Sequence, residues 1–144
     1  MASRLISKVI AGRAMPAAKP SATVLEAVRI MKANRSSAVV VVERRELVGI
    51  CTERDVVFGV VAEGLDPRRT QVAEVMTRDP QTIGPDRPLA HALHLMYEGH
   101  FRHVPVVDGS GHPIGLLCAS DALDMDCLEL GQDLVRREEI AAIL

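Results

Sequence analysis

Aromatic side chains are almost absent from this 144-residue sequence. There is no Trp, and the aromatic residues are Tyr97, Phe58 and Phe101. A core without large rings has to be built from Val, Leu, Ile, Ala and Met, which suits closely packed small α/β units. Hydrophobic residues still make up 48% of the chain and charged residues 25%, as in a globular domain that is long enough to bury a core.

An excess of one charge, paired cysteines and a long apolar run are also missing. The net charge is -2 and Lys and Arg are spread along the chain, so no basic face for nucleic acid is indicated. Cys51, Cys118 and Cys127 form no CxxC pair, which predicts reduced thiols and neither disulfides nor a zinc site. No apolar run approaches the ~20 residues that span a bilayer, and Met1–Lys8 leads into no apolar core of a secretory signal. We therefore expect a cytoplasmic protein without nucleic-acid or membrane partners.

The chain contains an internal repeat. Residues of the same type recur at an offset of 65 residues, and at 66 after a one-residue insertion in the second copy. The matching pairs are Pro20 and Pro85, Ala27 and Ala92, Met31 and Met96, Gly49 and Gly115, and Asp55 and Asp121. Order, spacing and residue class therefore predict two similar units.

Each copy shows the same succession of elements. Helical spacing of apolar residues predicts the helices, short β-branched runs predict the strands, and charged or Gly-rich segments predict the turns between them. In the first copy we expect a helix over 24–34, strands over 38–42 and 47–51, and a helix from Thr52 to about 63. In the second copy we expect a helix over 89–98, strands over 104–107 and 114–118, and a helix from about Ser120. A short helix over 71–76 is expected between the copies.

Both strand-to-helix junctions are similar to the pattern Gly-h-h-(Thr/Ser)-x-x-Asp, where h is apolar, with Cys118 in place of the hydroxyl residue in the second junction. The first junction reads GICTERD over 49–55, and the second reads GLLCASD over 115–121. With the preceding helix and hairpin, this pattern resembles the cystathionine-β-synthase (CBS) domain, and the resemblance covers about Ile10 to Leu123. It implies an α/β fold in which two βαββα repeats pack about a pseudo-twofold axis, as in a Bateman-type regulatory module.

The resemblance also implies a ligand, an adenine nucleotide such as AMP, ADP, ATP or an NAD-like or S-adenosyl compound, bound in the cleft between the repeats. Thr52 is then expected to hydrogen-bond a phosphate and Asp55 to accept from ribose hydroxyls. By the same resemblance Arg102 and His103, just before the second apolar strand, would face phosphates in the cleft with Thr52 and Asp55. Arg54 is a further candidate for phosphate, with a solvated helix face as its other interpretation.

The opposite cleft would hold Asp121, Cys118, Ser37 and Ala38. Cys118 stands where the first copy has a hydroxyl, and a thiol is a poor hydrogen-bond donor. We therefore predict one good nucleotide site and one that is weakened or differently selective. The nucleotide is a regulatory ligand, and no obligatory cofactor is expected.

Each of these residues also has a structural interpretation. Thr52 and Asp55 match a capping box, Arg102 can pair with Glu98, and His103 can be a hydrogen-bonded core histidine. The five histidines invite a metal hypothesis, although no Cys or carboxylate spacing supports a zinc site. No nucleophile elbow, P-loop or dinucleotide fingerprint appears, so a binding module is expected and not an enzyme.

Three hypotheses of function follow: a nucleotide sensor that acts in trans on a protein partner, a ligand-free scaffold for dimerisation or docking, and a metal-binding or redox-responsive protein that uses the histidines or Cys118. The sequence divides into an N-terminal segment with the first repeat (1–66), a linker helix with the second repeat (67–126) and a tail (127–144). The apolar residues among the charges of Asp124–Leu144 predict a helical tail that packs on a partner subunit, and the CBS resemblance implies a homodimer.

Overall fold

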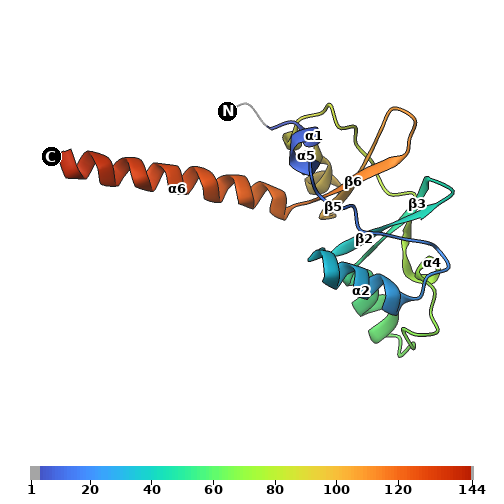
Figure 1. Ribbon diagram of the computed structural model, residues 1–144. Coiled ribbons are helices and arrows are strands. Elements are labelled where there is room, and N and C mark those ends of the chain that lie inside the picture. Colours follow the sequence, from blue (N-terminus) through green and yellow to red (C-terminus); the bar gives the residue numbers. More distant parts are fainter. Residues whose placement is uncertain (1–3, 144) are drawn as a thin grey trace.

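The computed structural model describes residues 4–143, with the side chains of 124–130 left out. Its two halves lie side by side, and one long helix projects away from both (Figure 1). The elements are α1 (Ile6–Ile10), β1 (Ala17–Ala18), α2 (Val24–Asn34), β2 (Ala38–Glu43), β3 (Glu46–Thr52), α3 (Glu53–Val56), the π-helix η1 (Val57–Val61), α4 (Val72–Val75), β4 (Thr77–Arg78), α5 (Leu89–Gly99), β5 (His103–Val107), β6 (Pro113–Cys118) and α6 (Ser120–Ile143).

The first repeat is built on a four-stranded sheet in the order β1-β2-β3-β4. Helix α2 begins with a capping box in which Thr23 and Glu26 satisfy each other's backbone N–H groups, and it ends at Arg35 in the left-handed conformation. Its apolar stripe packs with Val39 and Cys51 of the sheet. Met31 is 5% exposed and belongs to this core, in line with the expectation that Met helps to build it.

The second repeat has the same plan. Helix α5 packs on the β5–β6 hairpin, where Val104, Val106 and Leu117 are fully buried. A bulge interrupts both hairpins at equivalent places, after Val41 and after Val106. An isolated parallel bridge from Ile83 to Val106 repeats the parallel pairing of β1 with β2. The predicted α/β fold of two CBS-type repeats is confirmed.

The N-terminal segment packs in the second repeat, not in the first repeat with which the sequence division groups it. Ile6 and Val9 of α1 belong to the hydrophobic core that contains Leu89 and Met96. The backbone N–H of Ile6 donates to the carbonyl of Arg87 at 2.9 Å. The connection from α1 to β1 therefore crosses between the halves and ties them together.

The helix after the first motif differs from the expected regular helix. It is α-helical only over α3 and then continues as η1, where the Ala62 N–H donates to the carbonyl of Val57. This turn buries Val60 and leaves Phe58 and Val61 exposed. An apolar strip therefore remains on the surface of the first repeat.

Helix α6 joins the second motif and the predicted tail into one helix of 24 residues. The helical prediction for the tail is confirmed where the backbone is described; Leu144 and the side chains of 124–130 lie outside the described residues. Residues 131–143 are all exposed. Across residues 4–143, no helix is long and apolar enough to cross a membrane.

Candidate functional site

The motif of the first repeat forms a capping box at the junction of β3 and α3. The backbone N–H of Thr52 donates to Asp55 Oδ2 at 2.9 Å, and the Asp55 N–H donates to Thr52 Oγ1 at 3.2 Å. Both residues are half-buried. The structure therefore contains the capping box that was the structural interpretation of Thr52 and Asp55. This capping box uses one carboxylate oxygen of Asp55, Oδ2. Among the described side chains, which exclude those of 124–130, none forms a hydrogen bond or ion pair with the other oxygen, Oδ1.

The motif of the second repeat is closed by an internal ion pair. The Cys118 N–H donates to Asp121 Oδ2 at 2.9 Å, repeating the bond of the first motif. Arg13 Nη2 donates to the other oxygen, Asp121 Oδ1, at 2.7 Å. The Asp121 side chain is 6% exposed and that of Arg13 is 41% exposed. Both oxygens of the second motif acid therefore have protein partners.

Arg13 was not among the residues predicted from the sequence. It lies between α1 and β1, 108 positions from Asp121, so no local motif links the two. The repeat offset does provide a signal, because it pairs Arg13 with Arg78. Arg78 is exposed in β4 and makes no ion pair with Asp55 among the described residues, so the two motif acids differ.

The repeats meet at Ser37. Ser37 Oγ lies 2.6 Å from His103 Nε2 and 3.9 Å from Cys118 Sγ. On the other side of the same residue, the carbonyl of Ser37 accepts from the N–H of Glu53 at 2.9 Å. Ser37 therefore links the first motif to residues of the second repeat. His103 was expected with Thr52 and Asp55, but it contacts Ser37 and Cys118, which belong to the group expected in the opposite cleft.

His103 also changes the acidity of Cys118, the residue opposite it in the β5–β6 ladder. A hydrogen bond from His103, followed by bonds from Ser120, lowers the pKa of Cys118 to about 6, although partial burial opposes the shift. Cys51 shows the reverse, because burial and then the charge of Asp55 raise its pKa to about 12. Burial therefore keeps Cys51 protonated at neutral pH, whereas the lowered pKa of Cys118 favours its thiolate form.

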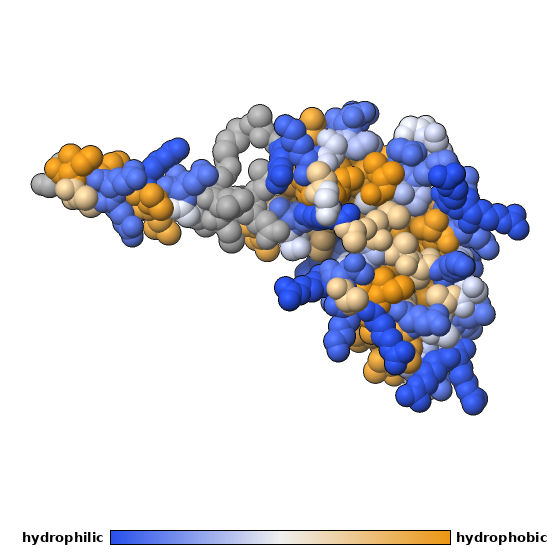
Figure 2. Space-filling model, in the orientation of Figure 1, coloured by the Kyte–Doolittle hydropathy of each residue, from blue (hydrophilic) through white to orange (hydrophobic). Residues whose placement is uncertain are grey.

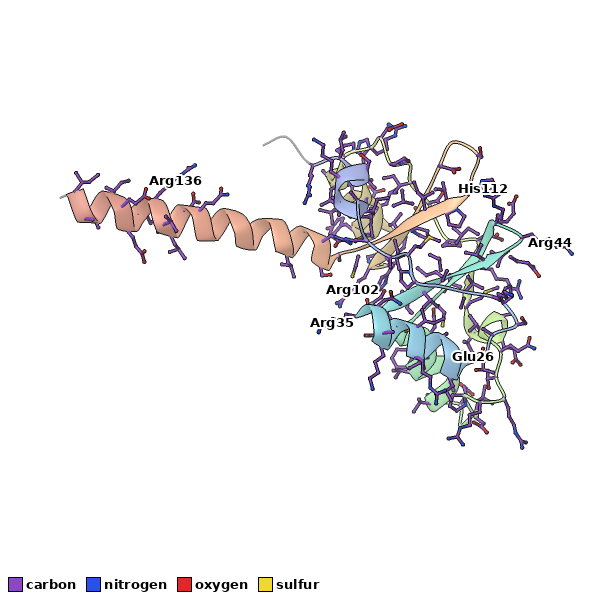
Figure 3. The ribbon with its side chains drawn as sticks, in the orientation of Figure 1. Glu26, Arg35, Arg44, Arg102, His112 and Arg136 are labelled. Carbon is purple, nitrogen blue, oxygen red and sulfur yellow. The ribbon has the colours of Figure 1, made fainter. Side chains whose placement is uncertain are left out.

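Two other candidate residues have different surroundings. The guanidinium of Arg54 lies 5.4 Å from the ring centroid of Phe58, a cation–π contact on the surface. Arg102 is exposed, and the alternative in which it pairs with Glu98 is not realised; Glu98 pairs instead with His94 at 3.1 Å. Among the described side chains, which Figure 3 shows as sticks, none forms an ion pair with Arg102.

Ala38 is fully buried at the start of β2, where it pairs with Thr52. Ala38 is therefore a wall residue and offers no polar group. A groove of about 580 Å³ opens beside Ser37 and runs between α2 and α3. Its apolar floor and charged rim are formed by Val28, Met31, Lys32, Arg35, Ser36, Ser37, Glu53, Val56 and Val57.

The histidines do not converge on a metal site in the part of the chain that the structure describes. No group of at least three His, Cys, Asp or Glu residues there is arranged to hold a metal ion. His94 pairs with Glu98, and His112 lies 3.9 Å from Asp108 in the β5–β6 turn. These contacts account for two of the five histidines as local surface pairs.

Comparison with known proteins agrees with the repeat. The family model for the CBS domain matches the chain twice, over residues 7–61 and 72–126. The chain therefore belongs to the CBS domain family, as a tandem pair of repeats. The match ends at residue 126, so most of α6 lies beyond it.

Relatives and solved structures are similar over most of the chain. A CBS domain-containing protein of Arabidopsis thaliana is 41% identical over 98 residues, which is 68% of this chain and 18% of that protein. The chain thus spans about a fifth of the length of the first curated relatives. A CBS domain protein from Pyrobaculum aerophilum, complexed with AMP, is 26% identical with a TM-score of 0.75, covering 82% of this chain and 89% of that one. A hexameric CBS-CP12 protein from bloom-forming cyanobacteria is 28% identical with a TM-score of 0.75, covering 84% and 67%.

Proposed function

We propose that this chain is a regulatory module that binds an adenine nucleotide at the first motif and acts in trans on a protein partner. The observation that carries the proposal is the difference between the two motif acids. Asp55 keeps Oδ1 free to accept from a ribose hydroxyl, whereas Asp121 has both oxygens engaged. The AMP complex of the Pyrobaculum aerophilum protein supports this class of ligand.

Arg102 supplies the cation for a phosphate in this proposal. It is exposed and unpaired among the described residues, and it precedes His103, which reaches Ser37 beside the first motif. A guanidinium suits phosphate because its planar donors match two oxygens at once. Thr52 takes part through its hydroxyl, which already accepts from Asp55 and keeps its proton for donation.

Signalling requires that the ligand prefer one arrangement of the repeats over another. The contact between Ser37 and His103 is placed to report such a change, because it joins the repeats beside the first motif. The change would be read by a partner protein, and we propose that the module acts as a homodimer. The hexameric CBS-CP12 protein supports self-association in this family.

A ligand-free scaffold is the alternative, and the capping box supports it. The side chains of Thr52 and Asp55 each accept a hydrogen bond from the other residue's backbone N–H, and this capping role explains both residues without a ligand. In that case the repeats serve as a rigid body for dimerisation or docking. The two functions differ in whether Asp55 contributes binding energy for a nucleotide.

The test is thermal unfolding with AMP, ADP, ATP, NAD and S-adenosylmethionine, for the wild type, Asp55→Asn and the matched Asp121→Asn. A ligand at a hundred times its Kd stabilises by about 2.7 kcal/mol, which is roughly 5–10 °C for a chain of this size. We expect a shift for the wild type and for Asp121→Asn, but not for Asp55→Asn. If no compound shifts the wild type, the scaffold interpretation replaces the sensor. A shift lost only in Asp121→Asn would move the site to the second motif.

A further inference from the structure

Helix α6 leaves most of its length without a partner. It is one continuous helix of 24 residues, about 36 Å long, and every side chain from 131 to 143 is exposed. Leu134, Val135 and Ile140 are 58%, 54% and 59% exposed. Figure 2 shows hydrophobic side chains among hydrophilic ones on the outer part of the projecting helix. An isolated helix as short as the exposed stretch 131–143 is marginal in water, so this end of α6 gains stability from a surface to pack on.

One face of this exposed end combines apolar groups with a central acid. Leu134, Val135, Glu138 and Ala142 recur at spacings that place them on one side of a helix, here called the arm face. Asp133 lies on the opposite side, together with Ile140, which therefore does not belong to the arm face. A carboxylate among apolar side chains is stable in an interface only when a cation meets it. The arm face therefore fits an apolar groove with a basic rim.

The groove between α2 and α3 has this character. Its floor contains Val28, Met31, Val56 and Val57. Its exposed rim carries two cations at the end of α2, Lys32 and Arg35, and one acid at the start of α3, Glu53. The exposed side chains of Phe58 and Val61 in η1 extend the apolar surface beyond it. A groove of about 580 Å³ lined in this way accepts the apolar face of a helix.

The arm face of one chain does not reach the groove of the same chain while α6 stays helical. Residues from 131 onward lie at least about 16 Å along the helix from Ser120, and Figure 1 shows α6 pointing away from both halves. A second copy has no such restriction. An exchange of two arms between two copies is also self-complementary, as a closed dimer requires.

We propose that the arm face of α6 packs in the α2–α3 groove of a second copy of this chain, with Glu138 beside Lys32 and Arg35. This inference rests on the proposed self-association and is independent of nucleotide binding. It concerns residues beyond the CBS family match, which ends at residue 126. The rim charges set the orientation of the arm, and the apolar contact supplies most of the affinity.

The first experiment measures the mass of the wild type, Glu138→Arg and Asp133→Arg by light scattering over a range of concentrations. Glu138→Arg should weaken association about tenfold or more, because it places a cation against two others. Asp133→Arg makes the same change of charge on the far side of α6 and should leave the mass unchanged. The combination of Glu138→Arg with Lys32→Glu and Arg35→Glu should restore association. All of these residues are exposed, so the fold of each variant is retained.

The second experiment locates the contact directly. The chain has only three lysines, Lys8, Lys19 and Lys32, so a zero-length carbodiimide cross-link from an amine to a carboxylate is simple to assign. In a mixture of 14N- and 15N-labelled protein, we expect a mixed-isotope peptide that joins Lys32 to Glu138. A monomeric wild type would overturn the proposed self-association itself. A dimer with no such peptide, and with unchanged masses for the variants, would overturn only the arm exchange.

Discussion

The pKa of Cys118 offers the most direct test of the contact between the repeats. His103 holds this thiol at about 6, against a usual value of 9.0. At pH 7 the thiolate fraction is then about 0.9, compared with about 0.01 for an unperturbed thiol. Replacing His103 with Gln removes the largest cause of the shift, so the pKa of Cys118 should rise toward its usual value.

The rate of alkylation at a single pH is a poor measure of this effect. A thiolate with a pKa lower by three units is intrinsically roughly 20-fold less nucleophilic. The large gain in thiolate therefore leaves a net rate advantage of only about fourfold at pH 7. The midpoint of the rate–pH profile, by contrast, reports the pKa itself and carries no such compensation.

The assay is iodoacetamide labelling from pH 4.5 to 10, read for each cysteine by peptide mass spectrometry. We expect a midpoint near 6 for Cys118 in the wild type and a midpoint above 8 in His103→Gln. Cys51 serves as the internal control, because its pKa of about 12 keeps it unlabelled at neutral pH. A wild-type midpoint near 9, or one that His103→Gln does not move, would refute the reasoning.

The same shift fixes the sign of a pH effect on stability. A thiol with a lowered pKa in the folded state adds stability that is fully present above its unfolded pKa of 9.0. This stability is lost as the pH falls through about 6. The difference in unfolding free energy between the wild type and His103→Gln should therefore be larger at pH 9 than at pH 5, as measured by urea unfolding.

Two substitutions test the packing around the motifs. Arg13→Ala removes the partner of the buried Asp121 carboxylate and should lower the free energy of unfolding, measured in urea, by about 2 kcal/mol. The control is Arg78→Ala, at the exposed equivalent position, which should change this free energy by less than about 0.5 kcal/mol. Equal losses in the two variants would contradict a stabilising role of the ion pair. Gly49→Ala would bring a Cβ within 2.6 Å of Met76 Sδ and 2.9 Å of the Thr77 carbonyl oxygen, so a loss of about 1–3 kcal/mol is expected and an unchanged midpoint would be unexpected.

The secondary structure was predictable because the local signals agree with the tertiary fold. Helix α2 carries its capping box, its apolar stripe and its left-handed end within one short segment. The strands follow from β-branched runs that are too short for helices, and the bulges at Val41 and Val106 fall at the repeat offset. Each of these features depends on neighbours in the sequence, which a single sequence displays.

The remaining features depend on residues far apart in the chain. The ion pair of Arg13 with Asp121 and the contact of Ser37 with His103 are set by how the repeats pack. No periodicity encodes such contacts. The π-helical turn over η1 also breaks a helix that the sequence predicts as regular. The capping box of Thr52 and Asp55 was foreseen as an interpretation, and only the structure shows that it leaves Oδ1 free.

The two motifs show how a duplicated fold becomes asymmetric without a change of backbone. In both repeats the backbone N–H at the helix cap donates to the motif acid at 2.9 Å, so the two junctions share the same backbone geometry at this point. The side chains then diverge: a hydroxyl and a free carboxylate oxygen remain in the first repeat, while the second holds an anionic thiol and an arginine on its acid. A phosphate approaching the second motif would meet the negative charge of Cys118, and a ribose would have to displace Arg13. The first motif carries neither cost, which is why the proposed nucleotide site is assigned to Asp55.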